Sequence, residues 1–260
     1  MISVRNVTHQ IGQKTILSDI SFDVNPGEFV VIIGPNGAGK TTLLKSLCKD
    51  FKPQHGSISF LGRDLDGYRT KELARIRSVL TQSNEISVNY TVEDLVGMGR
   101  YPHYENRPQA KDLSIIRTVM DELGILHLKD RYYYSLSGGE KQRVQLARVL
   151  VQIHDQETSV LFLDEPINGL DLLYQQLILE EARKYARKGR YVISILHDLN
   201  LASQYADKVL VLKEGKMICY GGRAETITEK TITETYNTRV RLIHDPQIDY
   251  PLVVPLTNLN

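Results

Sequence analysis

The stretch from Gly34 to Thr41, GPNGAGKT, constrains the fold more than any other part of the sequence. It matches the phosphate-binding loop pattern G-x-x-x-x-G-K-S/T at every fixed position. The apolar run at residues 29–33 predicts a buried strand before the loop, and the apolar spacing over residues 40–51 predicts a helix after it. A glycine-rich turn that fits the pattern by chance would not need these two flanks. The sequence therefore favours an α/β nucleotide-binding core.

This loop has the chemistry needed to hold a polyphosphate. The first turn of a helix leaves backbone N–H groups unpaired, and the helix dipole places about half a positive charge there. Glycines let the backbone wrap closely around phosphate oxygens. Lys40 would reach the β- and γ-phosphates, and the Thr41 hydroxyl would bind Mg²⁺. The residues predicted to contact the nucleotide here are Gly34, Pro35, Asn36, Gly37, Ala38, Gly39, Lys40, Thr41 and Thr42.

Composition places few further limits on the chain. Its 260 residues are near the upper limit for one domain, so one domain with an inserted lobe is expected. The formal net charge of +1 gives no indication of a general nucleic-acid-binding surface. Cys48 and Cys219 are predicted to be small buried side chains of a reducing compartment. No stretch approaches the roughly 18 apolar residues of a membrane span, and no secretory signal is recognised. These features predict a cytosolic chain that reaches a membrane only through another protein.

The order of predicted elements indicates an α/β core interrupted by a helical lobe. Strands over residues 2–7 and 16–24 would form an antiparallel edge ahead of the loop. From about residue 84, helical patterns replace strand-like runs, with predicted N-caps at Thr91 and Ser137. One helix of this lobe is predicted to bury Leu113, Ile116, Met120 and Leu123.

Strand patterns return in the last third of the chain. They cover residues 160–163, 191–196 and 209–212, with a helix predicted over 171–188. A short helix over 231–236, with Thr231 and Glu234 as a capping box, and two strand-like pieces follow in the tail. The predicted organisation is a single domain made of an α/β core (1–83 and 156–223), a helical subdomain (84–155) and a carboxy-terminal extension (224–260).

Four polar residues follow apolar runs, where an α/β sheet presents side chains to a ligand. Asp164 would hold Mg²⁺, and Glu165 would align or deprotonate the attacking water. Gln82 could contact both the Mg²⁺ and the water, and His197 could hydrogen-bond the γ-phosphate. Taken singly, each residue has an ordinary structural explanation: an acidic turn, a surface glutamine or a core histidine. Their shared position at strand ends favours one catalytic set.

A second glycine-bearing helix start lies at Ser137, Gly138 and Gly139. Its backbone donors suit a phosphate as well as those of the first loop. One ATP does not need two separated phosphate-binding helix starts from one chain. Ser137 and Gly139 are therefore predicted to bind an ATP held mainly by another subunit, which predicts a dimer with two composite sites.

Taken in order, these motifs resemble an ABC-type ATPase, and the similarity covers about residues 1–222. They are the phosphate loop, Gln82, Leu136–Glu140, Asp164–Pro166, Gly169–Asp171 and His197. The chain is similar to the ATP-binding subunit of a bacterial ABC importer. The resemblance implies a P-loop core with an N-terminal antiparallel β-subdomain and an inserted helical subdomain, using ATP and Mg²⁺. It also implies a head-to-tail homodimer on two membrane-spanning permease subunits at the cytoplasmic face of the inner membrane. A periplasmic binding protein would act through the permease, and no nucleic acid is implied.

Finer features resemble one group of importers. Residues 91–103 and 196–202 are similar to iron-chelate importers, and residues 151–159 resemble haemin-import subunits. The implied cargo is haemin, with a ferric siderophore or cobalamin as alternatives. A soluble ABC ATPase of an assembly scaffold would share the nucleotide motifs, but residues 91–103 favour the importer. A nucleotide-binding switch that does not hydrolyse ATP is disfavoured, because Glu165 is present as a predicted base for the attacking water.

Three positions depart from the family pattern. Ile11 stands about where an aromatic residue usually stacks on adenine, so Ile11 or His9 would offer a weaker platform. Ile167 replaces the usual threonine after Asp164-Glu165-Pro166, and Asn168 precedes Gly169 where other small residues are common. These changes leave the predicted phosphate and metal ligands intact.

Overall fold

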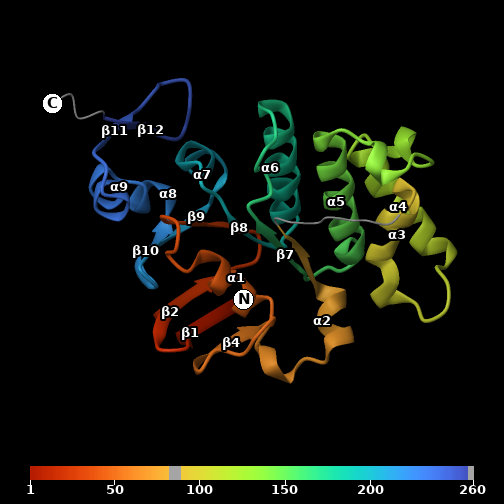
Figure 1. Ribbon diagram of the computed structural model, residues 1–260, viewed down its shortest axis with the longest axis horizontal. Coiled ribbons are helices and arrows are strands. Elements are labelled where there is room, and N and C mark those ends of the chain that lie inside the picture. The colour runs from red at the N-terminus through yellow and green to blue at the C-terminus, as the bar shows by residue number, and fades with distance from the viewer. Residues whose placement is uncertain (82–88, 257–260) are drawn as a thin grey trace. The chain divides into compact units, whose positions relative to one another are not determined.

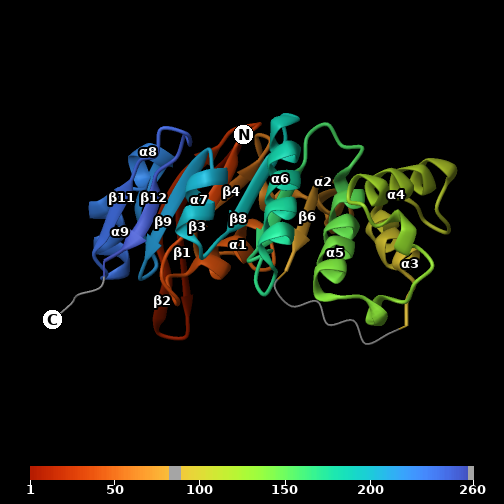
Figure 2. The same ribbon diagram turned by 90° about the horizontal axis from the view of Figure 1, so that it is seen from above.

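The computed structural model describes residues 1–81 and 89–256, and Gln82 lies outside the described residues. The chain divides into two compact units. The first comprises Met1–Gly67 and Tyr191–Asn260, and the second comprises Tyr68–Arg190. Figures 1 and 2 show the elements of both units in two views.

The first unit is rich in β-structure. One antiparallel group has the order β2-β1-β4-β5, formed by Lys14–Val24, Ile2–Ile11, His55–Phe60 and Arg63–Asp64. In a second group, β3 (Phe29–Ile33) pairs in parallel with both β8 (Tyr191–Ile195) and β9 (Lys208–Lys213). β10 (Lys216–Gly222) joins β9 in antiparallel fashion, and β11 (Val240–Ile243) forms a hairpin with β12 (Leu252–Pro255). All five residues of β3 are fully buried, as expected for a central parallel strand with both faces covered.

The helices of the first unit are short. They are α1 (Lys40–Leu47), η1 (Leu65–Gly67), α7 (Leu199–Tyr205), α8 (Arg223–Thr226) and α9 (Glu229–Tyr236). The Asp198 side chain caps α7 by accepting hydrogen bonds from the next turn, and Thr228 caps α9 in the same way.

The second unit is mainly helical. β6 (Arg77–Leu80) pairs in parallel with β7 (Val160–Asp164). Its α-helices are α2 (Thr70–Ile76), α3 (Val92–Gly97), α4 (Ala110–Glu122), α5 (Gly138–Ile153) and α6 (Leu172–Arg187) within the described residues. The 3₁₀ turns are η2 (Met98–His103), η3 (Leu126–Leu128) and η4 (Tyr133–Ser135). In Figures 1 and 2, α3, α4 and α5 lie side by side.

A buried arginine ties this helical part together. Arg100 in η2 is only 1% exposed. Its guanidinium donates to Asp112 on α4 at 2.9 Å. It also donates to the Val151 carbonyl on α5 and to Asp155, which follows α5, at 2.8 Å each. Lys111 also pairs with Asp155, at 2.8 Å. The network therefore connects three segments that are far apart in the sequence.

Most predicted elements are confirmed, and four details are wrong. Cys219 is half-buried rather than buried, because β10 is the edge strand of its sheet, whereas Cys48 is buried as predicted. The helix after the phosphate loop ends at Leu47 rather than residue 51, because Lys49 takes a left-handed conformation with φ 59°. Leu113 on α4 is 43% exposed, since the buried face of α4 includes Asp112, held by Arg100. The N-cap of α9 is Thr228 rather than Thr231, because the Thr228 hydroxyl accepts the Thr231 amide hydrogen. Thr91 and Ser137 are N-caps as predicted.

Candidate functional site

The predicted phosphate loop connects β3 to α1 in the first unit. The side chain of Lys40, the first residue of α1, is nearly buried and folds back over the loop. Its Nζ donates to the Gly34 carbonyl at 2.8 Å and to the Pro35 carbonyl at 3.0 Å. An ammonium group held in this way lies inside the loop, where it would meet phosphate oxygens.

Two glycines of this loop are required by close backbone approaches. A Cβ on Gly34 would lie 2.2 Å from the carbonyl oxygen of Leu212 on β9. A Cβ on Gly39 would lie 2.8 Å from the Ile16 carbonyl oxygen, and Gly39 has a φ of 99°. Only glycine fits both places, so the loop is packed tightly against strands β9 and β2 on its inner side.

His197 lies at the same edge as the loop. The pairing of β3 with β8 places Ile32 beside Ile195, and the Leu196 amide donates to the Ile32 carbonyl at 3.3 Å. His197 therefore follows β8 where the loop follows β3, and its side chain is exposed. The first unit thus brings together the loop and His197, as predicted from the strand ends.

The predicted acidic pair lies in the second unit. Asp164 ends the buried strand β7 and is 7% exposed. Glu165 follows in a left-handed conformation with φ 51°, and the Asn168 side chain donates to its Oε2. The Gln142 amide of α5 donates to the Pro166 carbonyl at 2.7 Å. The turn that carries Glu165 is therefore held by two hydrogen bonds, one from Asn168 and one from Gln142 on α5.

Sequence reasoning missed the roles of Asn168 and Gln142. Asn168 appeared only as a departure from the family pattern, and its position three residues after Glu165 was the available signal. Gln142 belongs to the glycine-bearing helix start, but nothing in the sequence indicates that it reaches the Pro166 carbonyl.

If Glu165 is the base for ATP hydrolysis, as the sequence predicts, replacing Asn168 with alanine is expected to lower kcat by about 10-fold, because small errors in the position of a catalytic group have large effects on rate. KM for ATP should change little, since Asn168 contacts Glu165 and not the phosphate loop. Steady-state kinetics measure both constants. Asn168→Ser, which replaces the amide donor with a hydroxyl donor, should retain more activity, and equal kcat in both variants and the native protein would exclude this positioning role.

The second glycine-bearing helix start has an ordered cap. The Ser137 hydroxyl accepts the Glu140 amide hydrogen at 3.3 Å, and Glu140 Oε2 accepts from the Ser137 amide at 2.8 Å. The latter bond lowers the pKa of Glu140. Ser137 and Gly138 are exposed, and a Cβ on Gly139 would lie 2.5 Å from the ring of Tyr174. The start of α5 therefore exposes its backbone at Ser137 and Gly138, whereas Gly139 packs against the ring of Tyr174.

The candidate residues fall into two sets. The loop residues and His197 belong to the first unit, whereas Asp164, Glu165 and the start of α5 belong to the second. The prediction for Gln82 lies outside the described residues. Of the two candidates for an adenine platform, Ile11 is 61% exposed, whereas the His9 ring is stacked on Phe51 at 4.1 Å. Ile11 is therefore the more accessible surface.

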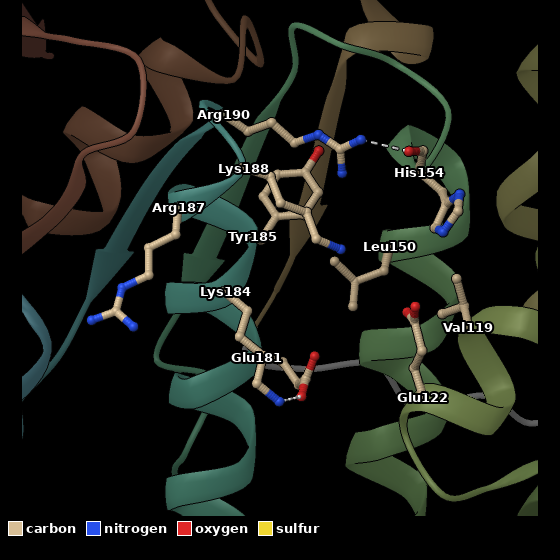
Figure 3. Close-up of a pocket in the computed structure, with 10 residues that line it drawn as sticks. All are labelled: Val119, Glu122, Leu150, His154, Glu181, Lys184, Tyr185, Arg187, Lys188 and Arg190. Carbon is tan, nitrogen blue, oxygen red and sulfur yellow. Dashed lines mark hydrogen bonds and ion pairs between the residues drawn. The ribbon is translucent and has the colours of Figure 1, made fainter.

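A cavity of about 400 Å³ in the second unit is lined by residues of α4, α5 and α6. Figure 3 shows Arg190 reaching the His154 carbonyl, at 2.7 Å, above the ring of Tyr185. Glu181 pairs with Lys184 at 2.7 Å. None of the predicted site residues that the structure describes lines this cavity, so it forms no part of the candidate ATP site.

The family model described as ABC transporter matches residues 17–168. The chain belongs to the ABC transporter family and is an ATPase that works with membrane permease components. It is 39% identical to a hemin import ATP-binding protein of Gloeobacter violaceus, with 98% of this chain and 94% of the relative covered. It is 41% identical to a hemin import ATP-binding protein of Pseudoalteromonas translucida, with 93% and 94% covered.

Solved structures agree with this assignment. A metal-chelate type ABC transporter in an inward-facing conformation aligns with a TM-score of 0.84 at 25% identity, covering 99% of this chain and 98% of that one. An ATP-binding cassette in its ADP conformation shares the fold, with a TM-score of 0.79 at 24% identity and coverages of 91% and 98%. In the part of the chain that the structure describes, no helix is both long and apolar enough to cross a membrane.

Proposed function

We propose that this chain hydrolyses ATP to drive the import of haemin across a bacterial inner membrane. The observation that carries the proposal is a complete phosphate loop, closed by Lys40, in a chain that resembles haemin-import ATP-binding proteins over nearly its whole length. Residues 91–103 support an importer, because they resemble the iron-chelate group. Ferric siderophore or cobalamin transport would use the same ATP site.

In the proposed site, the loop and Lys40 bind the phosphates of ATP. Backbone N–H groups at the start of α1 and the Lys40 ammonium stabilise the negative charge of the β- and γ-phosphates. Thr42 follows Thr41 in the first turn of α1 and would also contact the nucleotide. Ile11 would contact the adenine through an exposed aliphatic surface, with less stacking than an aromatic ring gives.

The donor set also fits Mg²⁺. The Asp164 carboxylate, nearly buried at the end of β7, and the Thr41 hydroxyl at the start of α1 are oxygen ligands of the kind that Mg²⁺ prefers. The side-chain carbonyl of Gln82 would be a third. When bound, the metal ion supplies positive charge that neutralises phosphate oxygens.

Glu165 carries the proton chemistry in this proposal. Its carboxylate orients the attacking water and accepts a proton from it, while Asn168 holds the carboxylate in place. The exposed imidazole of His197, beside the loop, hydrogen-bonds the γ-phosphate and stabilises its charge. Gln82 would contact the same water.

The exposed backbone of Ser137 and Gly138 at the start of α5 supports a composite site. Ser137, Gly138 and Gly139 would bind the γ-phosphate of an ATP held by the loop of a second copy, in a head-to-tail homodimer. ATP would close the dimer, and hydrolysis would reopen it. The helical subdomain (84–155) would contact one of two permease subunits at the cytoplasmic face of the membrane, and a periplasmic binding protein would deliver the cargo to them.

Replacing Lys40 with alanine is expected to weaken MgATP binding by at least about 100-fold, because each lost charge-assisted contact contributes about 1.5–3 kcal/mol and Lys40 would reach two phosphates. Isothermal titration with a nonhydrolysable ATP analogue measures the affinity. Lys45→Ala, an exposed lysine on the same helix, is the matched control and should bind normally. Unchanged affinity in Lys40→Ala would contradict the assignment of the loop.

Purification of the tagged chain from membranes tests the proposed partners. Recovery of a stable complex with a polytopic permease is the expected result. A stable complex with soluble partners alone would instead favour an assembly-scaffold ATPase.

A further inference from the structure

The first two turns of α5 are packed against the turn that follows β7 and against the start of α6. The half-buried side-chain amide of Gln142 donates to the Pro166 carbonyl at 2.7 Å. Three residues earlier, a Cβ on Gly139 would lie 2.5 Å from the ring of Tyr174. The Arg143 guanidinium lies over the same ring, 5.2 Å from its centroid. In Figures 1 and 2, α5 and α6 accordingly lie side by side.

The bond from Gln142 ends one residue beyond the predicted base. Glu165 precedes Pro166 in the turn and takes a left-handed conformation with φ 51°. The Asn168 side chain donates to the Glu165 carboxylate. Because the carboxylate and the neighbouring peptide group are both held, the position of Glu165 follows the position of Gln142 on α5.

The same helix begins at the residues proposed to bind the ATP of a second copy. The Ser137 amide donates to Glu140 Oε2 at 2.8 Å, and the Lys141 amide donates to the Ser137 carbonyl at 2.9 Å. Gln142 follows in the next turn of this hydrogen-bonded ladder. A short run of helix moves as one body, so a restraint on Ser137 also restrains Gln142.

We propose that Gln142 is a positioning residue that couples the two ATP sites of the dimer. This inference rests on the proposed composite site, in which Ser137 contacts the ATP of a second copy while Glu165 acts on the ATP of its own chain. Phosphate bound at the start of α5 restrains the helix, and the bond to Pro166 passes this restraint to Glu165. ATP in one site therefore favours hydrolysis in the other, and for binding the coupling is reciprocal.

The test measures the rate of hydrolysis against ATP concentration in native protein and in Gln142→Met, which keeps the length of the side chain and removes its donor. We expect a Hill coefficient of about 1.5 in native protein and about 1 in the variant. The variant's kcat should fall about tenfold, because the base is less well placed. In a Glu165→Gln background, Gln142→Met should change the residual rate by less than about twofold, since no base is left to position. A tenfold fall there as well would indicate a structural role and contradict the inference.

Gln152→Met is the matched control. Its side-chain amide, on the same helix, donates to the Ala74 and Arg77 carbonyls at 2.6 and 2.9 Å, where α2 meets β6. This variant should lose at least as much thermal stability as Gln142→Met but keep the native Hill coefficient.

Three results would overturn the inference: no cooperativity in native protein, an unchanged Hill coefficient in Gln142→Met, or an equal fall in Gln152→Met. Failure of the composite site is separately visible. Glu165→Gln would then remain a monomer with MgATP, whereas an ATP-bound dimer of Glu165→Gln with an unchanged Hill coefficient in Gln142→Met would contradict the role of Gln142 alone.

Discussion

Replacing Glu165 with glutamine is expected to lower kcat for ATP hydrolysis by about 10²- to 10⁴-fold, the usual contribution of general base catalysis. At 1.36 kcal/mol for each factor of ten, this corresponds to a barrier about 3–5 kcal/mol higher. The amide keeps the size of the carboxylate but accepts a proton poorly. MgATP affinity should be retained, because the phosphate loop lies elsewhere in the sequence and is unchanged.

Steady-state hydrolysis and equilibrium ATP binding, measured on the same preparation, check this expectation. Glu157→Gln, an exposed carboxylate in the same unit, is the control and should hydrolyse ATP normally. The variant should also accumulate as an ATP-bound dimer, since the proposed closed state can no longer reopen by hydrolysis. Near-normal turnover in Glu165→Gln would remove this residue from the mechanism.

Replacing Arg100 with methionine is expected to reduce the free energy of unfolding by about 3–5 kcal/mol, because it leaves buried carboxylates without their partner. The Arg100 side chain is 2% exposed, and those of its partners Asp112 and Asp155 are 8% and 16% exposed. Lys111 also pairs with Asp155, but its side chain is 70% exposed, so its contribution is weakened by solvent. Denaturant titration measures the loss, and Lys111→Met should change stability by less than about 1 kcal/mol. Equal stability of the two variants would contradict the account.

The same network predicts that the stability of the folded protein depends on pH. Burial alone would raise the pKa of Asp155, but the hydrogen bonds and charges of Arg100 and Lys111 lower it well below its usual range. A carboxyl whose pKa is lowered in the folded state stabilises the protein above its unfolded pKa of about 4, and loses this contribution as the pH falls through the folded value. The stability of Arg100→Met should therefore change less on acidification than that of the native protein.

Local patterns were sufficient for much of the fold. The glycine spacing of residues 34–41, the caps at Thr91 and Ser137, and the apolar strands depend on neighbours within a few residues, so the sequence alone predicts them. Contacts across long distances in the sequence could not be predicted in this way. Arg100 pairs with an aspartate 55 residues away, and its bond to Asp112 accompanies the burial of Asp112 rather than Leu113 on α4.

The candidate site shows the same division. Lys40 and His197 lie where their strand ends suggested, because parallel strands bring their carboxyl ends to one edge. The position of Asn168 beside Glu165 depends on how a turn packs, and no motif records this contact. The proposal of a composite site between two copies rests on the presence of two helix starts that are both predicted to bind phosphate.

The most direct test of the account is haemin uptake by proteoliposomes that contain this chain with its permease and binding protein. We expect haemin to accumulate inside only when MgATP is present on the side that this chain occupies, and the uptake to be abolished by Glu165→Gln. ATP-dependent uptake of a ferric siderophore or cobalamin, but not of haemin, would contradict the proposed cargo. ATP-independent uptake, or uptake unaffected by Glu165→Gln, would contradict the claim that hydrolysis by this chain drives transport.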